Sequence, residues 1–206
     1  MDENIGRVLD ALKKKGLDKN TIVCLLSDNG GLSTAEGSPT CNFPLRAGKG
    51  WLYEGGIREP FLIKYPKVVE AGSVCHNPVI GVDFYPTILE LAGLPLKPDQ
   101  HVDGVSLVPF LKGDRTFDRG PIFWHYPHYG GKGDTPGGAI RMGDYKLIEF
   151  YEDNHVELYN LRTDISETHD LSKEKPEVAA DLLKRLHDWR KACGAKMPKT
   201  NPNYKK

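Results

Sequence analysis

The chain has 206 residues, of which 39% are hydrophobic and 27% are charged, so its length and apolar content allow one or two domains with a sizeable core. Lysine plus arginine and aspartate plus glutamate both number 28, which gives a formal net charge of zero. This balance excludes a global positive field that would attract nucleic acid or an anionic membrane. No apolar run approaches the roughly 18 residues of a membrane span, and the first residues are unlike a secretion signal.

The first 26 residues have the pattern of a helix followed by a strand. Apolar residues recur from Ile5 to Leu12 at the spacing of one helical face, and Gly16 marks the end of that helix. The run 21–26 is almost wholly apolar, which is typical of a central parallel strand with both faces covered. Without neighbouring strands such a segment exposes apolar edges, so we expect the isolated chain to aggregate or to need a complementing partner.

A second helix is predicted in the middle of the chain. It follows Asp83, which we interpret as its N-cap, and it carries Phe84 and Leu91 on one face before Gly93 ends it. Beyond about residue 100, prolines and a glycine-rich stretch up to Gly138 indicate a long loop region rather than regular elements.

The last third of the chain has the composition of a small sheet with a helix. The runs Ala139–Tyr151 and Val156–Leu161 are rich in strand-forming residues and are separated by a polar tetrapeptide, which predicts an antiparallel hairpin. A final helix is expected between Pro176 and Trp189, with an apolar stripe that packs beside the hairpin.

Two oxygen donors directly follow the apolar run 21–26. Asp28 offers a charged oxygen and Asn29 a carbonyl oxygen, a pair that suits Ca²⁺ or Mg²⁺ better than zinc. Ligands of open α/β sheets bind beyond the carboxyl ends of strands, where this pair is expected to lie. Asx-Gly dipeptides also end strands as simple turns, and on this motif alone the turn is the preferred interpretation.

Further short motifs occur along the chain and change that preference. In order they are Asp28-Asn29-Gly30, Gly48-Lys49-Gly50, Glu54-Gly55-Gly56-Ile57-Arg58-Glu59-Pro60, Val82-Asp83-Phe84-Tyr85-Pro86-Thr87-Ile88, Asp103-Gly104-Val105-Ser106-Leu107 and Glu157-Leu158-Tyr159-Asn160-Leu161. Each is weak alone, but their order and spacing resemble the sulfatase family of the alkaline phosphatase superfamily, and most closely its arylsulfatase A and N-acetylgalactosamine-6-sulfatase branch. The resemblance implies the C-terminal portion of an α/β catalytic domain over 1–100. A loop region, a small antiparallel sheet and a C-terminal helix would follow over 101–206.

The resemblance implies roles for individual residues. Asp28 and Asn29 match two of the family's calcium ligands. Lys49 matches the lysine that contacts the sulfate oxygens, a catalytic and substrate-binding role, and the glycines beside it would allow the backbone to approach the ligand closely. A sulfate ester needs its negative oxygens held and its developing charge neutralised, for which a divalent cation and fixed cationic side chains are suited.

Two further features have weaker assignments. Glu54 and Arg58 are four residues apart, and we interpret them as an ion pair that supports the turn carrying Lys49 rather than as catalytic groups. His125 lies among aromatic residues at 123–129 that could stack on a sugar ring, and its imidazole could reach a substrate hydroxyl or sulfate. Ordinary packing of a partly exposed histidine is an equal alternative.

The family's nucleophile signature is absent from this sequence. Sulfatases of this type carry a Cys or Ser in a C/S-x-P-S-R motif that is oxidised to formylglycine, and no cysteine here has proline two residues on and arginine four residues on. We therefore expect a C-terminal sulfatase part that lacks turnover alone. It would act on a sulfated sugar or aryl sulfate together with a missing N-terminal half, in a periplasmic, extracellular or lysosomal setting.

Two alternatives remain open. The chain could be a catalytically inactive fragment or remnant that serves as a binding or structural piece. It could also be a phosphoesterase of the same superfamily, although zinc sites there would be expected to use Asp and His where this chain has Asn29.

Overall fold

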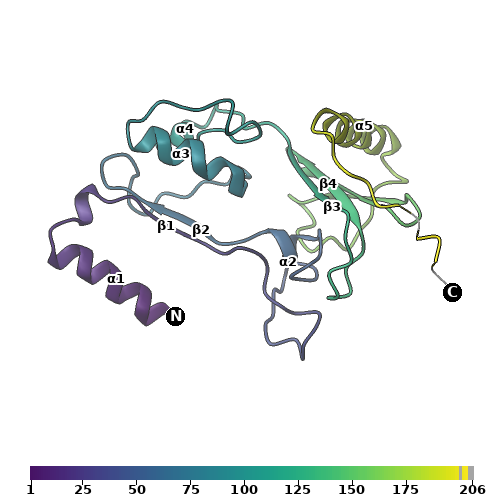
Figure 1. The fold of residues 1–206 in the computed structure, drawn as a ribbon, viewed down its shortest axis with the longest axis horizontal. Helices are drawn as coiled ribbons and strands as arrows, with labels where there is room; N and C mark the ends of the chain where they lie inside the picture. Colours follow the sequence, from purple (N-terminus) through teal and green to yellow (C-terminus); the bar gives the residue numbers. More distant parts are fainter. Residues whose placement is uncertain (200, 204–206) are drawn as a thin grey trace. The chain divides into compact units, whose positions relative to one another are not determined.

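The structure is a computed structural model of the chain and describes residues 1–199 and 201–203. Its elements in chain order are α1 (Asp2–Lys14), the 3₁₀ helix η1 (Asp18–Asn20), β1 (Val23–Leu26), α2 (Glu54–Ile57), β2 (Phe61–Lys64), the 3₁₀ helix η2 (Gly81–Asp83), α3 (Phe84–Leu91), α4 (Val108–Leu111), β3 (Ile122–Tyr126), β4 (Gly137–Met142), β5 (Tyr145–Phe150), β6 (Val156–Asn160) and α5 (Pro176–Ala192) (Figure 1). Among these described residues, no helix is long and apolar enough to cross a membrane.

The chain folds into two compact units, each formed by two separate stretches of sequence. Unit 1 contains Met1–Leu26 and Pro60–Arg119, and unit 2 contains Ser27–Glu59 and the chain from Gly120 onward. The predicted division at residue 100 separates two parts of a sulfatase. The boundaries of the two compact units lie at other residues.

Unit 1 contains the predicted N-terminal helix and strand, but the strand has a different partner from the one expected. α1 ends before Gly16, whose φ is 67°. β1 pairs with β2 in antiparallel register, with Cys24 opposite Ile63, and the two form a two-stranded sheet. Among the described residues β1 has an antiparallel and no parallel neighbour, and Leu25 and Leu26 are 41% and 47% exposed, which agrees with the expectation for this strand without its neighbouring strands. A short apolar run has no period that distinguishes the two arrangements.

The predicted helix after Asp83 is present as α3, but the Asp83 side chain does not cap it. Asp83 is fully buried and accepts hydrogen bonds from the backbone N–H groups of Ile80 and Val105, each at 3.0 Å. It also accepts two bonds from the Arg119 guanidinium, at 2.9 and 2.8 Å. Asp83 therefore joins the start of α3 to two later segments of unit 1, which is a larger role than the one predicted.

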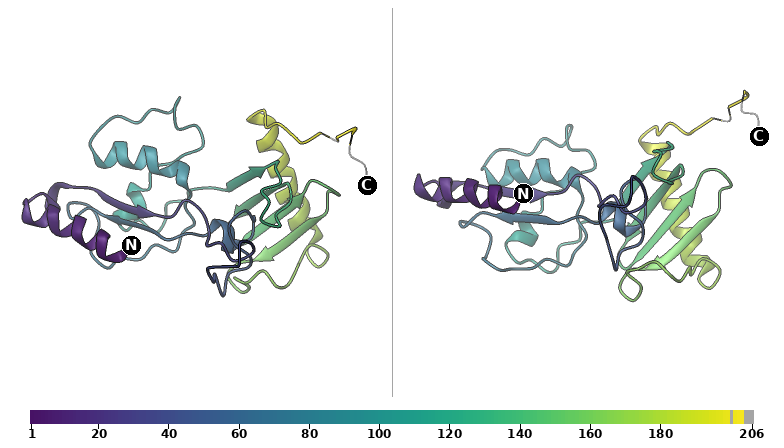
Figure 2. Two further views of the ribbon diagram at one scale, coloured as in Figure 1. Left: turned by 60° about the horizontal axis from the view of Figure 1, so that its bottom comes forward. Right: turned by 90° about the horizontal axis from the view of Figure 1, so that it is seen from below.

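Unit 2 is built on a four-stranded antiparallel sheet in the order β3-β4-β5-β6, crossed by α5 (Figure 2). The final helix agrees with the prediction, but the strands are more numerous than expected. The run Ala139–Tyr151 contains two strands separated by a turn at Gly143, whose φ is 58°. β3 lies within the region predicted as loop. The Gly143-Asp144 pair at this turn is a two-residue hairpin signal, and it divides the run that was predicted as one strand.

The two faces of this sheet carry different layers. On one face, Ile140 and Leu147 pack with Leu186 of α5, and all three are fully buried. On the other face, Ile148 and Tyr159 pack with Tyr53, which directly precedes α2. Because successive side chains of a strand point to opposite faces, one sheet supports both the C-terminal helix and the segment that carries Lys49.

Candidate functional site

All of the residues predicted for the site lie in unit 2, namely Asp28, Asn29, Lys49, Glu54, Arg58 and His125. The first five occur on three short segments that are bonded to one another: the chain after β1, the loop around Lys49, and α2. His125 lies on β3, in the sheet below.

The segment that carries Asp28 and Asn29 lies directly against α2. The backbone N–H of Gly30 donates to the carbonyl oxygen of Gly56 at 3.1 Å. A Cβ atom on Gly30 would lie 1.9 Å from the carbonyl oxygen of Gly55, so no other residue fits at this position without moving the backbone. A Cβ atom on Gly55 would lie 2.4 Å from the carbonyl oxygen of Ala47, and one on Gly56 would lie 2.1 Å from that of Trp51, so the close contact of these backbones explains the glycines of both motifs.

The loop around Lys49 is bonded to the same segment. The backbone N–H of Lys49 donates to the carbonyl oxygen of Gly31 at 3.2 Å. The Asn42 side chain donates to that same oxygen at 2.8 Å and to the carbonyl oxygen of Ala47 at 2.9 Å. These bonds hold the backbone of Lys49 against Gly31, which is two residues after Asn29 in the chain. Asn29 and Lys49 are 20 residues apart in sequence.

The functional groups at this point are free to meet a ligand. Lys49 and Asp28 are exposed and Asn29 is half-buried. Within residues 1–199 and 201–203, the Lys49 ammonium forms no hydrogen bond or ion pair. An exposed cation beside a carboxylate and an amide can bind an anion and a hard cation at neighbouring positions.

Glu59 adds a second carboxylate beside Asp28. Burial and the negative charge of Asp28 raise the pKa of Glu59, so the two carboxylates lie near each other. The Oε1 atom of Glu59 is buried and has no hydrogen-bond partner among the described residues. Two carboxylates and the Asn29 amide provide the oxygen atoms that hard divalent cations prefer as ligands. No group of three His, Cys, Asp or Glu suited to a metal occurs in the described part of the chain.

A buried group of charged residues anchors α2 to the sheet. Lys146 of β5 is fully buried, and its ammonium donates to Glu54 at 3.0 Å and to Glu167 at 2.8 Å. Glu167 also accepts the backbone N–H of Glu54 at 2.6 Å. Arg58 and Arg141 lie 3.5 and 3.6 Å from the Glu54 carboxylate. The pair predicted between Glu54 and Arg58 is thus the outer part of a larger group whose centre is Lys146.

The other end of the Lys49 loop is fixed to the same sheet. Arg46 donates to the hydroxyl of Tyr159 at 2.9 Å and to the carbonyl oxygen of Glu167 at 2.8 Å. Its guanidinium carbon lies 3.8 Å from the centroid of the Tyr53 ring, a cation–π contact. Lys49 therefore lies between two anchored points, and its loop can hold one geometry without help from the lysine side chain.

His125 is bonded within unit 2 through both ring nitrogens. Its Nε2 lies 3.0 Å from the carbonyl oxygen of Lys196, which can only accept, so Nε2 donates and Nδ1 accepts from the Tyr151 hydroxyl at 2.8 Å. Phe123, two residues earlier on β3, stacks on Trp189 of α5. This arrangement places His125 on the α5 side of the sheet, and its predicted contact with substrate stays a prediction.

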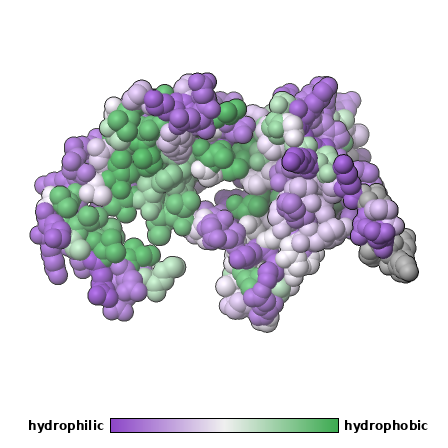
Figure 3. Space-filling model, in the orientation of Figure 1, coloured by the Kyte–Doolittle hydropathy of each residue, from purple (hydrophilic) through white to green (hydrophobic). Residues whose placement is uncertain are grey.

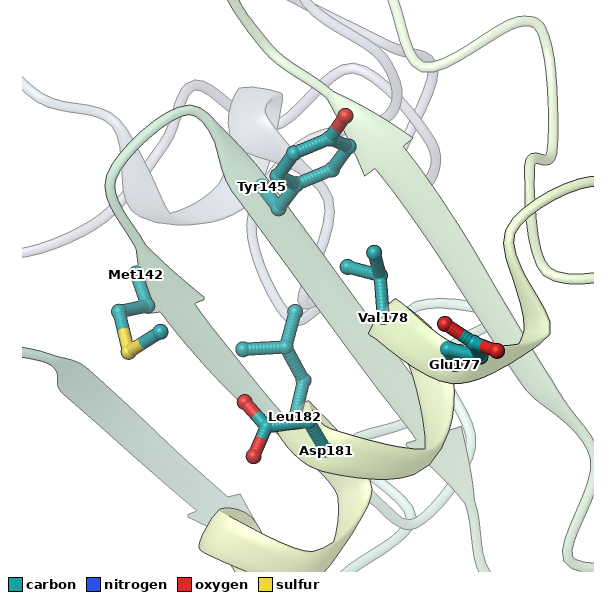
Figure 4. A pocket seen from close by; sticks show the side chains of 6 residues that line it. All are labelled: Met142, Tyr145, Glu177, Val178, Asp181 and Leu182. Atoms are coloured by element: carbon teal, nitrogen blue, oxygen red, sulfur yellow. The ribbon is translucent and has the colours of Figure 1, made fainter.

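A pocket of about 350 Å³ lies between the start of α5 and the β4–β5 turn (Figure 4). It is lined by Met142, Tyr145, Glu177, Val178, Asp181 and Leu182. None of the predicted site residues lines it, and its two charged residues are carboxylates, which would repel a sulfate group. The anion-binding candidate is therefore the exposed surface around Lys49.

Lys146 and Glu167 were not predicted as part of the site, because no local pattern identifies them. Lys146 is 92 residues from Glu54 in the chain and occupies one position in an ordinary strand pattern. Glu59 lies within the Glu-Gly-Gly-Ile-Arg-Glu-Pro motif, so the sequence offers it as a candidate site residue. Its proximity to Asp28 could not be predicted from the sequence.

Residues 47–192 match the family described as N-sulphoglucosamine sulphohydrolase, C-terminal. The chain belongs to the sulfatase family. The matched region includes Lys49, α2 and all four strands of the unit 2 sheet. The predicted resemblance is confirmed, and so is the α/β fold with a smaller antiparallel sheet and a C-terminal helix.

Individual sulfatases are similar over most of this chain. A sulfatase of Formosa agariphila is 39% identical over 212 aligned residues, which cover 92% of this chain and 38% of the relative. The N-acetylgalactosamine-6-sulfatase of Mus musculus is 34% identical over 165 residues, or 80% of this chain and 30% of the relative. The structure of BT4656 in complex with its substrate D-glucosamine-2-N,6-O-disulfate has a TM-score of 0.76 and 30% identity, over 92% of this chain and 38% of that one. This chain thus spans less than two fifths of the length of each.

Proposed function

We propose that this chain supplies part of the active site of a sulfuric ester hydrolase that acts on a sulfated sugar. Asp28 and Asn29 would ligate Ca²⁺, and Lys49 would contact the sulfate oxygens. The observation that carries this proposal is the 3.2 Å bond from the Lys49 backbone to Gly31, because it holds the lysine beside the Asp-Asn pair. A pair of cation ligands and a cationic side chain at one exposed point are what a sulfate ester requires.

Each side chain has a defined part in the proposed chemistry. The Lys49 ammonium would donate hydrogen bonds to the sulfate oxygens and stabilise the negative charge that develops on them. Asp28 and Asn29 would present carboxylate and amide oxygens to the cation, and Glu59 would add negative charge beside Asp28. When bound, Ca²⁺ would polarise an oxygen of the ester.

The proposed substrate class comes from the related proteins. One relative is named for a 6-sulfated amino sugar and one similar structure contains a glucosamine disulfate as substrate. A sugar sulfate has a small, strongly anionic group on a polar ring. An exposed lysine suits such a ligand better than an enclosed apolar pocket would.

Calcium binding to the purified chain tests the proposed metal ligands. Calorimetric titration with Ca²⁺ is expected to show binding that Asp28→Ala removes, because the variant lacks the charged oxygen donor. Asp10→Ala is the matched control, since Asp10 is an exposed aspartate of α1 in the other unit. Equal calcium affinity in the wild type and in Asp28→Ala would contradict the proposal.

Binding of a sulfated sugar tests the role of Lys49. D-Glucosamine-2-N,6-O-disulfate in the presence of Ca²⁺ is expected to bind the wild type and to lose about tenfold or more in affinity with Lys49→Gln, the loss expected for one charge-assisted hydrogen bond. Unchanged affinity would show that the lysine does not contact the sulfate.

A second candidate function is a binding piece without catalysis. It is favoured by the sequence itself, in which no cysteine lies in a C/S-x-P-S-R signature. Neither candidate expects the chain alone to hydrolyse an aryl sulfate, so ligand binding distinguishes the two. Loss of sulfated-sugar affinity in both Asp28→Ala and Lys49→Gln supports the first candidate, whereas sugar binding that neither substitution changes supports the second.

A further inference from the structure

A second lysine lies beside Lys49 on a loop that is fixed by a buried carboxylate. Asp134 is 5% exposed and accepts the backbone N–H groups of Gly130 at 2.7 Å and of Lys132 at 2.9 Å. Gly131 and Gly133, on either side of Lys132, have φ values of 73° and 87°. A buried aspartate and two left-handed glycines together hold the backbone of Lys132 in one conformation.

This loop is in direct contact with the segment that carries Lys49. The Trp51 indole N–H donates to the carbonyl oxygen of Lys132 at 3.2 Å, and the Thr34 hydroxyl donates to the same oxygen at 3.1 Å. A Cβ atom on Gly50 would lie 3.2 Å from the Cβ of Lys132. The side chains of Lys49 and Lys132 therefore start from neighbouring backbones of the same unit, 83 residues apart in sequence.

The charges at this place are two ammonium groups and one carboxylate. The Lys132 ammonium pairs with the carboxylate of Glu36, and their side chains are 25% and 63% exposed. The hydrogen bond and charge of Lys132 lower the pKa of Glu36, and the charge of Lys49 lowers it further. The three groups thus carry a net charge of +1, and Glu36 occupies the ammonium of Lys132 while Lys49 has no partner among the described residues.

We propose that Lys49 and Lys132 form a subsite for a sugar that carries two anionic groups, rather than for a monosulfated one. Lys49 contacts the sulfate ester that is cleaved, and Lys132 contacts a second sulfate or carboxylate of the same ligand. Glu36 leaves Lys132 as this second group enters, because an exposed ion pair is weak and the ligand that Lys49 already holds brings its second anionic group close to the ammonium. This inference rests on the proposed function of Lys49.

An alternative explanation for the geometry is that the pair of Lys132 and Glu36 only joins two loops. The two explanations predict opposite effects of Glu36→Gln. If Glu36 competes with the ligand, the amide raises affinity for a doubly charged sugar. If the pair is only a structural link, the amide weakens the site and lowers affinity, as Lys132→Gln does.

The test is calorimetric binding of two probes to the full chain in Ca²⁺, D-glucosamine-2-N,6-O-disulfate and D-glucosamine-6-O-sulfate. The wild type is expected to bind the disulfate about tenfold more tightly, the effect of one additional charge-assisted contact. Lys132→Gln is expected to remove this preference, and Glu36→Gln to increase it by up to about fivefold. Lys173→Gln, an exposed lysine elsewhere in unit 2, is the control and should bind both probes as the wild type does.

Each result has a separate meaning. A preference that survives in Lys132→Gln, or equal losses in Lys132→Gln and Glu36→Gln, would overturn the two-lysine subsite. If one of these results is found but Lys49→Gln abolishes binding of both probes, the proposed function of Lys49 stands and only the subsite fails. If the wild type binds neither probe, both are overturned. Circular dichroism spectra of the variants that match the wild type confirm that the loops carry these substitutions without unfolding.

Discussion

Replacing Lys146 with methionine is expected to destabilise unit 2 more than any exposed substitution. The variant has a side chain of similar length but leaves the Glu54 and Glu167 carboxylates without the ammonium that lies 3.0 and 2.8 Å from them. Glu54 keeps Arg58 and Arg141 nearby, whereas Glu167 keeps the Glu54 N–H, so the uncompensated charge falls on Glu167. Breaking a buried ion pair from one side costs about 3–5 kcal/mol of unfolding free energy.

Urea denaturation monitored by circular dichroism measures this difference, and thermal unfolding should show a fall of about 6–20 °C in Tm. The control is Lys184→Met, which removes an exposed pair with Asp188 and should change the free energy of unfolding by about 0.5 kcal/mol or less. Adding Glu167→Gln to Lys146→Met should restore stability, because the neutral amide removes the buried charge.

The pH dependence of this variant gives an independent test. Burial raises the pKa of Glu167 above its ordinary value of 4.5, and Lys146 opposes that rise. Without the lysine the folded-state pKa rises further, so the folded state takes up a proton more readily than the unfolded state. The stability that this proton confers is present below about pH 4.5 and is lost as pH rises through the folded-state pKa. The deficit of Lys146→Met should therefore narrow on acidification, and a deficit below about 1 kcal/mol at every pH would refute the reasoning.

Three further predictions concern other parts of the chain. Gly30→Ala should lower the unfolding free energy by about 1–3 kcal/mol in urea melts, because its Cβ meets a carbonyl oxygen at 1.9 Å, whereas Gly6→Ala in the exposed helix α1 should be neutral or stabilising; equal effects would contradict the packing argument. Burial raises the pKa values of Tyr53 and Tyr159, so stability should fall as pH rises above about 10, and ultraviolet titration in which every tyrosine ionises normally would count against this. Figure 3 shows hydrophobic residues gathered over unit 1, and the exposed apolar residues of this unit include Leu62 of β2, which is 56% exposed. Leu62→Lys should increase the monomer fraction in sedimentation velocity, and a wild type that is already monomeric would oppose the predicted association.

The sequence predicted helices and motifs more accurately than it predicted strand pairing. The apolar spacing of α1, α3 and α5 is local, and glycines or prolines mark the ends of these helices, so their positions followed from the chain itself. β1 was assigned correctly as a strand, but its antiparallel partner β2 begins 35 residues after the end of β1, and no property of an apolar tetrapeptide specifies that partner.

The candidate site shows the same contrast between local and distant information. Asp28, Asn29 and Lys49 could be proposed as site residues because they occur in short motifs, and the backbone bond between Gly31 and Lys49 brings their segments together. Lys146 could not be identified, because its importance depends on a contact with Glu54 from a different part of the chain.

The anchoring of α2 has a consequence for the order in which this protein is made. Arg46 and Glu54 emerge from the ribosome long before Lys146 and Glu167, their partners on the sheet. Until those later residues are synthesised, the loop with Lys49 lacks its contacts with the sheet. The Glu54 carboxylate, which is buried in the folded unit, then lacks the Lys146 ammonium. A chain interrupted shortly before Lys146 would contain Asp28, Asn29 and Lys49 but would lack the sheet contacts that anchor their segments, so late frameshifts should impair the site even though its motifs are complete.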